Sequence, residues 1–266
     1  MNQYTHLNDL KAGAESVINH LRLIDDIMFS IALDGQNEAV EEMLNTILER
    51  DDIRVLSVIT QKEMREFDSH GVRLDVLATD DHHRLYNIEI QRADDGANVK
   101  RARYNASMLD VHATRSGQSY EDLPETFTIF ITEHDVLKKD RSIVHIERGI
   151  LETGESFNDE QHIIYVNAAV DDHTRISQLM HDFLATDYRS MSNTKLAELV
   201  KFYKHTKEGR RVMCEAEIRF GLAQRQVGRE EGERNIVRKM KEKGFTPNFI
   251  SSTLEIPLER VKELIK

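Results

Sequence analysis

The stretch VRLDVLATDDHHRLYNIEIQ, residues 72–91, decides the fold, because it reads as two short apolar-rich strands joined by a polar link. One carboxylate interrupts each apolar run: Asp75 in the first and Glu89 in the second, with Gln91 two residues after the glutamate. Side chains alternate between the two faces of a strand, so Glu89 and Gln91 point the same way. If the runs pair as a hairpin, Asp75 lies beside them. The stretch therefore predicts a cluster of two acids and one amide on a sheet.

The segments around this hairpin predict an α/β fold with a mixed sheet between helices. Residues 14–50 carry apolar side chains at helical spacing, and residues 98–115 form a second helical stretch after the hairpin. A helix between two strands favours a crossover connection, which makes the strand after it parallel to the strand before it. Six strands are expected, at residues 53–60, 72–79, 85–91, 127–132, 143–148 and 162–167.

The rest of the chain is predicted to be helical, and we expect three parts: a core at 1–170, a helical extension at 171–227, and a charged hinge with a short helical tail at 228–266. The segment GREEGERN is a charged low-complexity piece, interpreted as a hinge or a solvated helix turn. In the tail, Gly244 is expected to end one helix, Thr246 and Pro247 to begin the next, and Pro257 to open the last.

Composition describes an ordinary protein of the aqueous phase. The 266 residues are 39% hydrophobic and 31% charged, so a real core is expected. No apolar run approaches the roughly 20 residues that a bilayer requires, and the N-terminus lacks a basic and then apolar signal pattern. We therefore expect a cytoplasmic protein with no membrane partner. The net charge of −11 argues against indiscriminate binding of polyanions, but basic residues gather between Lys195 and Lys243, which leaves room for a local patch.

Several kinds of chemistry lack the residues they need. Cys214 is the single cysteine, which excludes an internal disulfide and a cysteine-based zinc cage. His82 and His83 are adjacent, so their side chains diverge and they are interpreted as the link of the hairpin. The glycine-rich signatures of ATP or dinucleotide binding are absent.

The chemistry left to the central hairpin is that of a hard cation. Two carboxylates on adjacent strands suit Mg²⁺ or Mn²⁺, which keep open positions for water and phosphate oxygens. A cation of this kind can activate water and stabilise charge on a phosphodiester under attack. On spacing alone, a solvated strand face is the simpler explanation of Asp75 and Glu89, and a metal site is the alternative.

The order of features resembles a known family. Asp75, Glu89 and Gln91 on consecutive strands, after an N-terminal helix and before a basic one, look like the core of PD-(D/E)XK nucleases. More narrowly, the segments RLDVLATDD and LYNIEIQ, then KRARYNASML, FTIFIT and HIIYVN, resemble the recombination-promoting nucleases, also described as PD-(D/E)XK nuclease family transposases. The resemblance runs from about residue 23 to the C-terminus and implies a central sheet of the restriction-endonuclease-like type.

That resemblance implies a metal-dependent DNA endonuclease. Asp75 and Glu89 would bind Mg²⁺ or Mn²⁺, and Gln91 would stand where the superfamily name has lysine, without its positive charge. Lys100, Arg101 and Arg103 would contact the DNA backbone if their helix faces the site; a solvated helix face is the alternative.

Smaller features complete the resemblance and its alternative. Asp26 and Phe29 resemble the family's early D-x-x-F motif, with Ser30 where lysine is usual, and Asn105 replaces the second residue of a frequent Tyr-Tyr pair. The alternative function is a catalytically weak or inactive DNA-binding or oligomeric scaffold on the same fold. In either case DNA is the expected partner, and homo-oligomers through the C-terminal helices are a further expectation.

Overall fold

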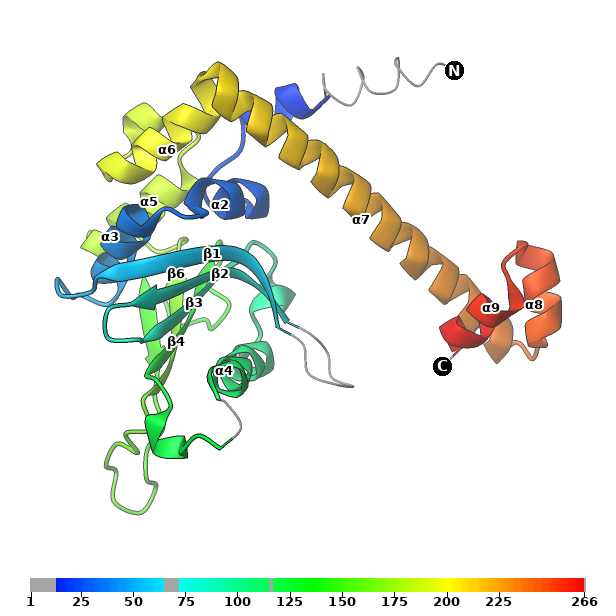
Figure 1. The fold of residues 1–266 in the computed structure, drawn as a ribbon, viewed down its shortest axis with the longest axis horizontal. Coiled ribbons are helices and arrows are strands. Elements are labelled where there is room, and N and C mark those ends of the chain that lie inside the picture. The colour runs from blue at the N-terminus through cyan, green and yellow to red at the C-terminus, as the bar shows by residue number, and fades with distance from the viewer. Residues whose placement is uncertain (1–12, 65–71, 115–116, 266) are drawn as a thin grey trace. The chain divides into compact units, whose positions relative to one another are not determined.

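A six-stranded mixed sheet lies at the centre of the fold (Figure 1). The computed structural model describes residues 13–64, 72–114 and 117–265. The strands stand in the order β1-β2-β3-β4-β6-β5; β3, β4 and β6 run parallel, and the other pairs are antiparallel. Their bounds are β1 Val55–Met64, β2 Val72–Asp80, β3 Leu85–Gln91, β4 Thr126–Thr132, β5 Ile143–Ile146 and β6 Gln161–Asn167. The predicted mixed sheet is confirmed, as is the parallel pair on either side of a crossover helix.

The middle strands are apolar because helices cover both faces of the sheet there. Every residue of β4, TFTIFIT, is buried, and β3 is buried at its five central positions. Strands of a parallel pair are normally covered on both faces, and they read as continuous apolar runs for that reason. Glu89 stands in the middle of such a strand, so its carboxylate cannot belong to a solvated face.

Helices α2, α3 and α5 cover one face of the sheet, and α4 lies on the other (Figure 1). Helix α6 packs on α2 and α3. The predicted helical run 14–50 is interrupted at residues 19–25 and again at residues 34–36, where Gly35 adopts a positive φ of 67° between α2 and α3. The bounds are α2 Asp26–Leu33, α3 Asn37–Ile47, α4 Val99–Ala113, α5 Arg175–Leu184 and α6 Thr194–His205, with short 3-10 turns η1 Asp94–Ala97, η2 Tyr120–Asp122 and η3 Tyr188–Ser190.

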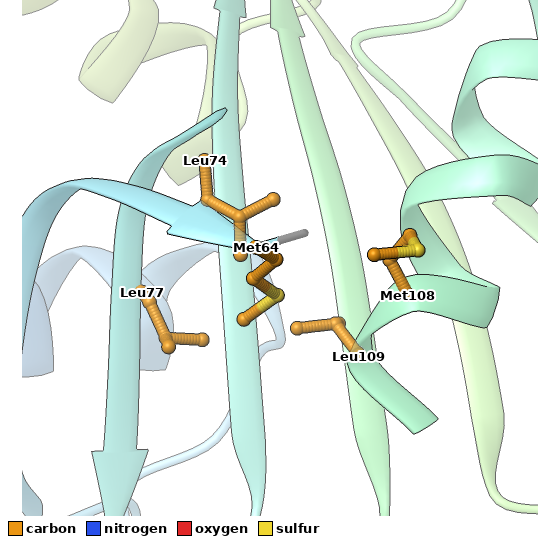
Figure 2. Close-up of a cluster of buried hydrophobic side chains, with 5 residues drawn as sticks. All are labelled: Met64, Leu74, Leu77, Met108 and Leu109. Atoms are coloured by element: carbon orange, nitrogen blue, oxygen red, sulfur yellow. The ribbon is translucent and has the colours of Figure 1, made fainter. Parts of the chain in front are cut away.

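Helix α4 is fixed to the sheet by an apolar contact near its C-terminal end. Met108 and Leu109 pack with Met64, Leu74 and Leu77 from β1 and β2, as Figure 2 shows. Residues seven apart on a helix lie two turns apart on nearly the same side. The same side of α4 therefore carries residue 101 toward the sheet.

The chain divides into two compact units, and the second, Glu215–Lys266, contains the short helical tail. Gly244 has a positive φ of 88° at the helix end, and the Thr246 side chain accepts a hydrogen bond from the backbone N–H of Phe249 at the next helix start. The tail packs around Val237, Ile250, Val261 and Leu264. Its helices are the C-terminal part of α7 Lys207–Glu242, then α8 Pro247–Leu254 and α9 Leu258–Ile265.

The segment GREEGERN, residues 228–235, is helical and lies within α7, which agrees with a solvated helix turn and not with a break in the chain. The three-part division at residues 170 and 227 stays a prediction. Among the described residues, no helix combines the length and apolar character needed to cross a bilayer.

Candidate active site

The hairpin places Asp75 and Glu89 next to each other. Strands β2 and β3 are antiparallel, and their register pairs Val76 with Ile88. Asp75 precedes Val76 and Glu89 follows Ile88, so the two acids occupy the next facing positions of the two strands. The Asp75 carboxylate accepts a hydrogen bond of 3.0 Å from the backbone N–H of Ile90. Glu89 is fully buried, whereas Asp75 is partly buried. The side chains that the sequence predicts to converge are thus brought together by one strand pairing.

Both carboxyls have a raised pKa. Burial is the largest cause in each case, because removing a carboxylate from water disfavours its charged form. The charge of Asp75 raises the pKa of Glu89 further. A bound cation would relieve the mutual repulsion of the two carboxylates.

Gln91 continues the same side of β3 and lies against the turn η1. A Cβ on Gly96 would collide with Oε1 of the Gln91 side chain and would lie 3.6 Å from Nη1 of Arg101. The absence of a side chain at residue 96 therefore makes room for the Gln91 amide. It also shows that the amide and the Arg101 guanidinium occupy the same small region.

Arg101 reaches the acids from α4. Its Nη2 atom donates to Oε2 of Glu89 at 3.2 Å, and its Nη1 atom donates to the Gly96 carbonyl at 3.0 Å. The Asn98 side chain caps the helix by accepting from the backbone N–H groups of Lys100 and Arg101. The first turn of α4 is thereby held at the site.

The three basic residues that are predicted to contact DNA separate into two groups. Arg101 contacts Glu89, while the side chains of Lys100 and Arg103 are exposed. That all three side chains contact the DNA backbone stays a prediction. Arg101 differs from the other two because its guanidinium already contacts a carboxylate of the site.

One further acid beside the site is not among the site residues that the sequence predicts. The charge of Asp26, the first residue of α2, is near enough to raise the pKa of Asp75. The resemblance to the D-x-x-F motif was the available signal. Close by, Arg92 follows Gln91 and forms ion pairs of 2.9 Å with both Asp25 and Glu133, which ties the start of α2 to the ends of β3 and β4.

Buried polar residues on the α4 side of the sheet are a second feature that sequence patterns did not reveal. Asn87 precedes Glu89 by two residues, and Thr128 on β4 is the register partner of Asn87. Asn105, which stands where the family often has tyrosine, is buried one turn after Arg101. Polar atoms of all three lack hydrogen-bond partners within the described part of the chain. The interior beneath α4 is therefore polar as well as apolar.

The residues fit a divalent cation held by few protein ligands. Oε1 of Glu89 is buried without a hydrogen bond of ordinary geometry among the described residues, and Oε2 is held by Arg101. The Asn87 side chain and the Asp75 backbone are close enough to lower the pKa of this carboxyl. Within residues 13–64, 72–114 and 117–265, no set of three His, Cys, Asp or Glu side chains is arranged to hold a metal. Mg²⁺ commonly takes only one or two carboxylates and keeps several waters, so the pair Asp75 and Glu89 is sufficient.

A mixed sheet that carries two neighbouring acids on a hairpin, one fully buried and one partly buried, with a basic helix beside them, is the arrangement expected of a nuclease. The family model described as PD-(D/E)XK nuclease family transposase matches residues 27–213, more than half of the chain. The chain belongs to this family, and the restriction-endonuclease-like type of fold is confirmed with it. No curated protein and no solved structure matches the chain.

The raised pKa of Glu89 predicts how stability depends on pH. The native state binds this proton more tightly than the unfolded chain does, so the ionised carboxylate weakens folding above the unfolded pKa. Glu89→Gln stays neutral and should raise the free energy of unfolding by about 1–3 kcal/mol at about pH 8, with the gain shrinking toward about pH 4. Urea denaturation at several pH values measures it. Glu121→Gln, at an exposed position, is the control; an equal gain at every pH contradicts the prediction.

Proposed function

We propose that this nuclease-family protein is a metal-dependent DNA endonuclease that acts in recombination or transposition. The observation that carries the proposal is the pairing of Asp75 with fully buried Glu89, one of whose oxygens makes no hydrogen bond of ordinary geometry among the described residues. Family membership supports a nuclease.

Each residue has a defined part in this proposal. Asp75 and Glu89 hold Mg²⁺ or Mn²⁺, and the Ile90 N–H fixes the Asp75 carboxylate for that purpose. When bound, the cation supplies Lewis-acid chemistry to a phosphodiester. The Gln91 amide offers two donors and one acceptor beside the acids and orients a water molecule or a phosphate oxygen. Lys100 and Arg103 bind the DNA backbone from the exposed side of α4.

Cleavage of supercoiled plasmid DNA tests the proposal. Purified protein should produce nicked or linear plasmid with Mg²⁺ or Mn²⁺, and EDTA should stop the reaction. Intact plasmid under all conditions would favour the alternative, a non-catalytic DNA-binding or oligomeric scaffold. Cleavage that persists in EDTA would also reject a metal-dependent mechanism.

Gly96→Ala tests the placement of Gln91 without changing the amide. The added methyl group collides with the end of the Gln91 side chain, which is flexible and can move away. We expect cleavage to fall by about tenfold to a hundredfold, with a midpoint of thermal unfolding close to that of the wild type.

Gly221→Ala is the matched control, because a Cβ at residue 221 meets nothing within 4 Å. It should leave cleavage unchanged. Equal cleavage by Gly96→Ala and the control would show that the position of the Gln91 amide does not matter.

A further inference from the structure

Arg101 is the one basic residue of the predicted DNA-binding set whose guanidinium contacts a site carboxylate. We propose that Arg101 is a positioning residue: it fixes Glu89 through Oε2 and brings to the neighbourhood of Gln91 the positive charge that this amide lacks. The inference rests on the proposed endonuclease function and assigns Arg101 a role different from that of Lys100 and Arg103.

The contacts of Arg101 point inward. Nη1 and Nη2 are engaged, one by the Gly96 carbonyl and the other by Glu89. The side chain is 39% exposed, whereas the carboxylate it holds is 0% exposed. A planar guanidinium with two fixed partners keeps its orientation, because its donors form a rigid fork. Two of its five N–H donors are therefore directed at the site and not at the solvent.

The contact also determines which oxygen of Glu89 remains available. Arg101 occupies Oε2, while Oε1 is buried without a hydrogen bond of ordinary geometry in the described part of the chain. A carboxylate held by one oxygen presents the other in a fixed direction. Arg101 therefore orients Glu89 for a cation and does not compete for the same atom.

The position of the charge completes the argument. Arg101 Nη1 and Gln91 Oε1 both lie beside the place of a Cβ on Gly96. A guanidinium stays protonated at all working pH values. The positive charge that a lysine on β3 would provide is thus delivered from α4, one strand-to-helix connection further along the chain.

Comparison of single variants separates this role from a phosphate contact. Arg101→Met should lower the rate at saturating DNA by about a hundredfold. Its Kd for a linear duplex, measured with Ca²⁺ at fixed ionic strength, should change by less than about twofold. Lys100→Met and Arg103→Met should each weaken the same Kd by about fivefold to tenfold.

Arg189→Met, an exposed residue of η3 outside the site, is the control for general effects of removing a cation. Arg101→Lys, which keeps the charge but loses the fork, should retain part of the rate. If Arg101→Met weakens the Kd as Lys100→Met does and keeps the full rate, Arg101 is a phosphate contact and the proposal fails.

Moving the charge back to β3 is the stricter test. Gln91→Lys in the Arg101→Met background should restore the rate by at least about tenfold, since it returns a cation to the same region. The same substitution in the wild type should give no gain. Absence of rescue would overturn the part of the proposal that concerns charge.

An unfolding cycle tests the contact even if the wild type does not cut DNA, which would be the failure of the proposed function alone. Arg101→Met should lower the urea midpoint because it leaves the buried Glu89 carboxylate uncompensated. Glu89→Gln and the double variant Glu89→Gln/Arg101→Met should have similar midpoints. Equal losses from Arg101→Met in both backgrounds would show that Arg101 does not hold Glu89.

Discussion

Replacement of Glu89 by Gln, or of Asp75 by Asn, is expected to slow metal-dependent DNA cleavage by about a thousandfold or more while the protein stays folded. The amides have nearly the same shape as the acids but lack the charge that holds a cation. Neither variant leaves a cavity. Both relieve the repulsion between neighbouring carboxylates that raises the pKa of Glu89. Initial rates on supercoiled plasmid with Mn²⁺ and circular dichroism spectra of the same samples provide the measurement.

Glu121→Gln is the control for loss of one negative charge, because residue 121 is exposed in η2. It should cut at the wild-type rate. The two acids act as a unit, so the double variant should be hardly slower than either single variant. Wild-type rates in both single variants would remove Asp75 and Glu89 from the reaction.

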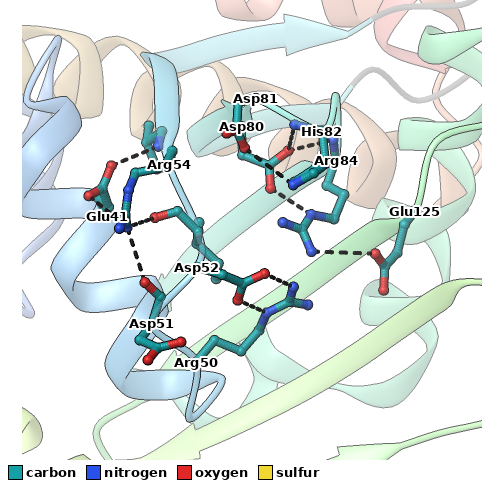
Figure 3. A network of polar contacts seen from close by, with 12 residues as sticks. Glu41, Arg50, Asp51, Asp52, Arg54, Asp80, Asp81, His82, Arg84 and Glu125 are labelled. Carbon is teal, nitrogen blue, oxygen red and sulfur yellow. Dashed lines mark hydrogen bonds and ion pairs between the residues drawn. The ribbon is translucent and has the colours of Figure 1, made fainter.

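The largest effect on stability is expected at Asp80, the last residue of β2. Its carboxylate is fully buried and accepts hydrogen bonds from Arg84 Nε at 2.6 Å and from the backbone N–H groups of His82 and Arg84 (Figure 3). It also accepts from the Tyr86 hydroxyl at 2.9 Å. Asp80→Ala leaves the buried Arg84 cation and these donors without their acceptor. We expect a loss of about 3–5 kcal/mol in the free energy of unfolding.

Asp81→Ala is a matched control in the same turn. Its side chain is 43% exposed, and substitutions at such positions change stability by only about 0.5 kcal/mol. Urea denaturation of both variants measures the difference. Because the turn carries the hairpin, Asp80→Ala should also reduce cleavage. Equal stability of the two variants would mean that Asp80 does not hold the hairpin together.

Strand pairing was predictable because the evidence for it is local. The alternation in LYNIEIQ and the apolar run TFTIFIT fix two strands, and His82 and His83 mark the link between β2 and β3. Once β2 pairs with β3 across this link, Asp75 and Glu89 are brought next to each other. The resemblance to the nuclease family then favours a functional site over a solvated face.

Other features of the site depend on packing between elements far apart in sequence. No local pattern shows which of the basic residues of α4 faces the sheet, because Arg101 and its exposed basic neighbours carry the same charge. The contact of Arg101 with Glu89 follows from the packing of Met108 and Leu109. The approach of Asp26 to Asp75 depends on how α2 lies on β2. The close fit of Gly96 over Gln91 depends on the three-dimensional arrangement of η1 and β3, since a glycine in a turn has many causes.

The central claim is that a divalent cation binds between the carboxylates of Asp75 and Glu89. A crystal structure of the protein with Mn²⁺, with anomalous scattering to identify the ion, tests it most directly. We predict a manganese peak that contacts both carboxylates and reaches Glu89 through Oε1, with Arg101 still on Oε2. Manganese bound elsewhere, with no peak between Asp75 and Glu89, would contradict the account.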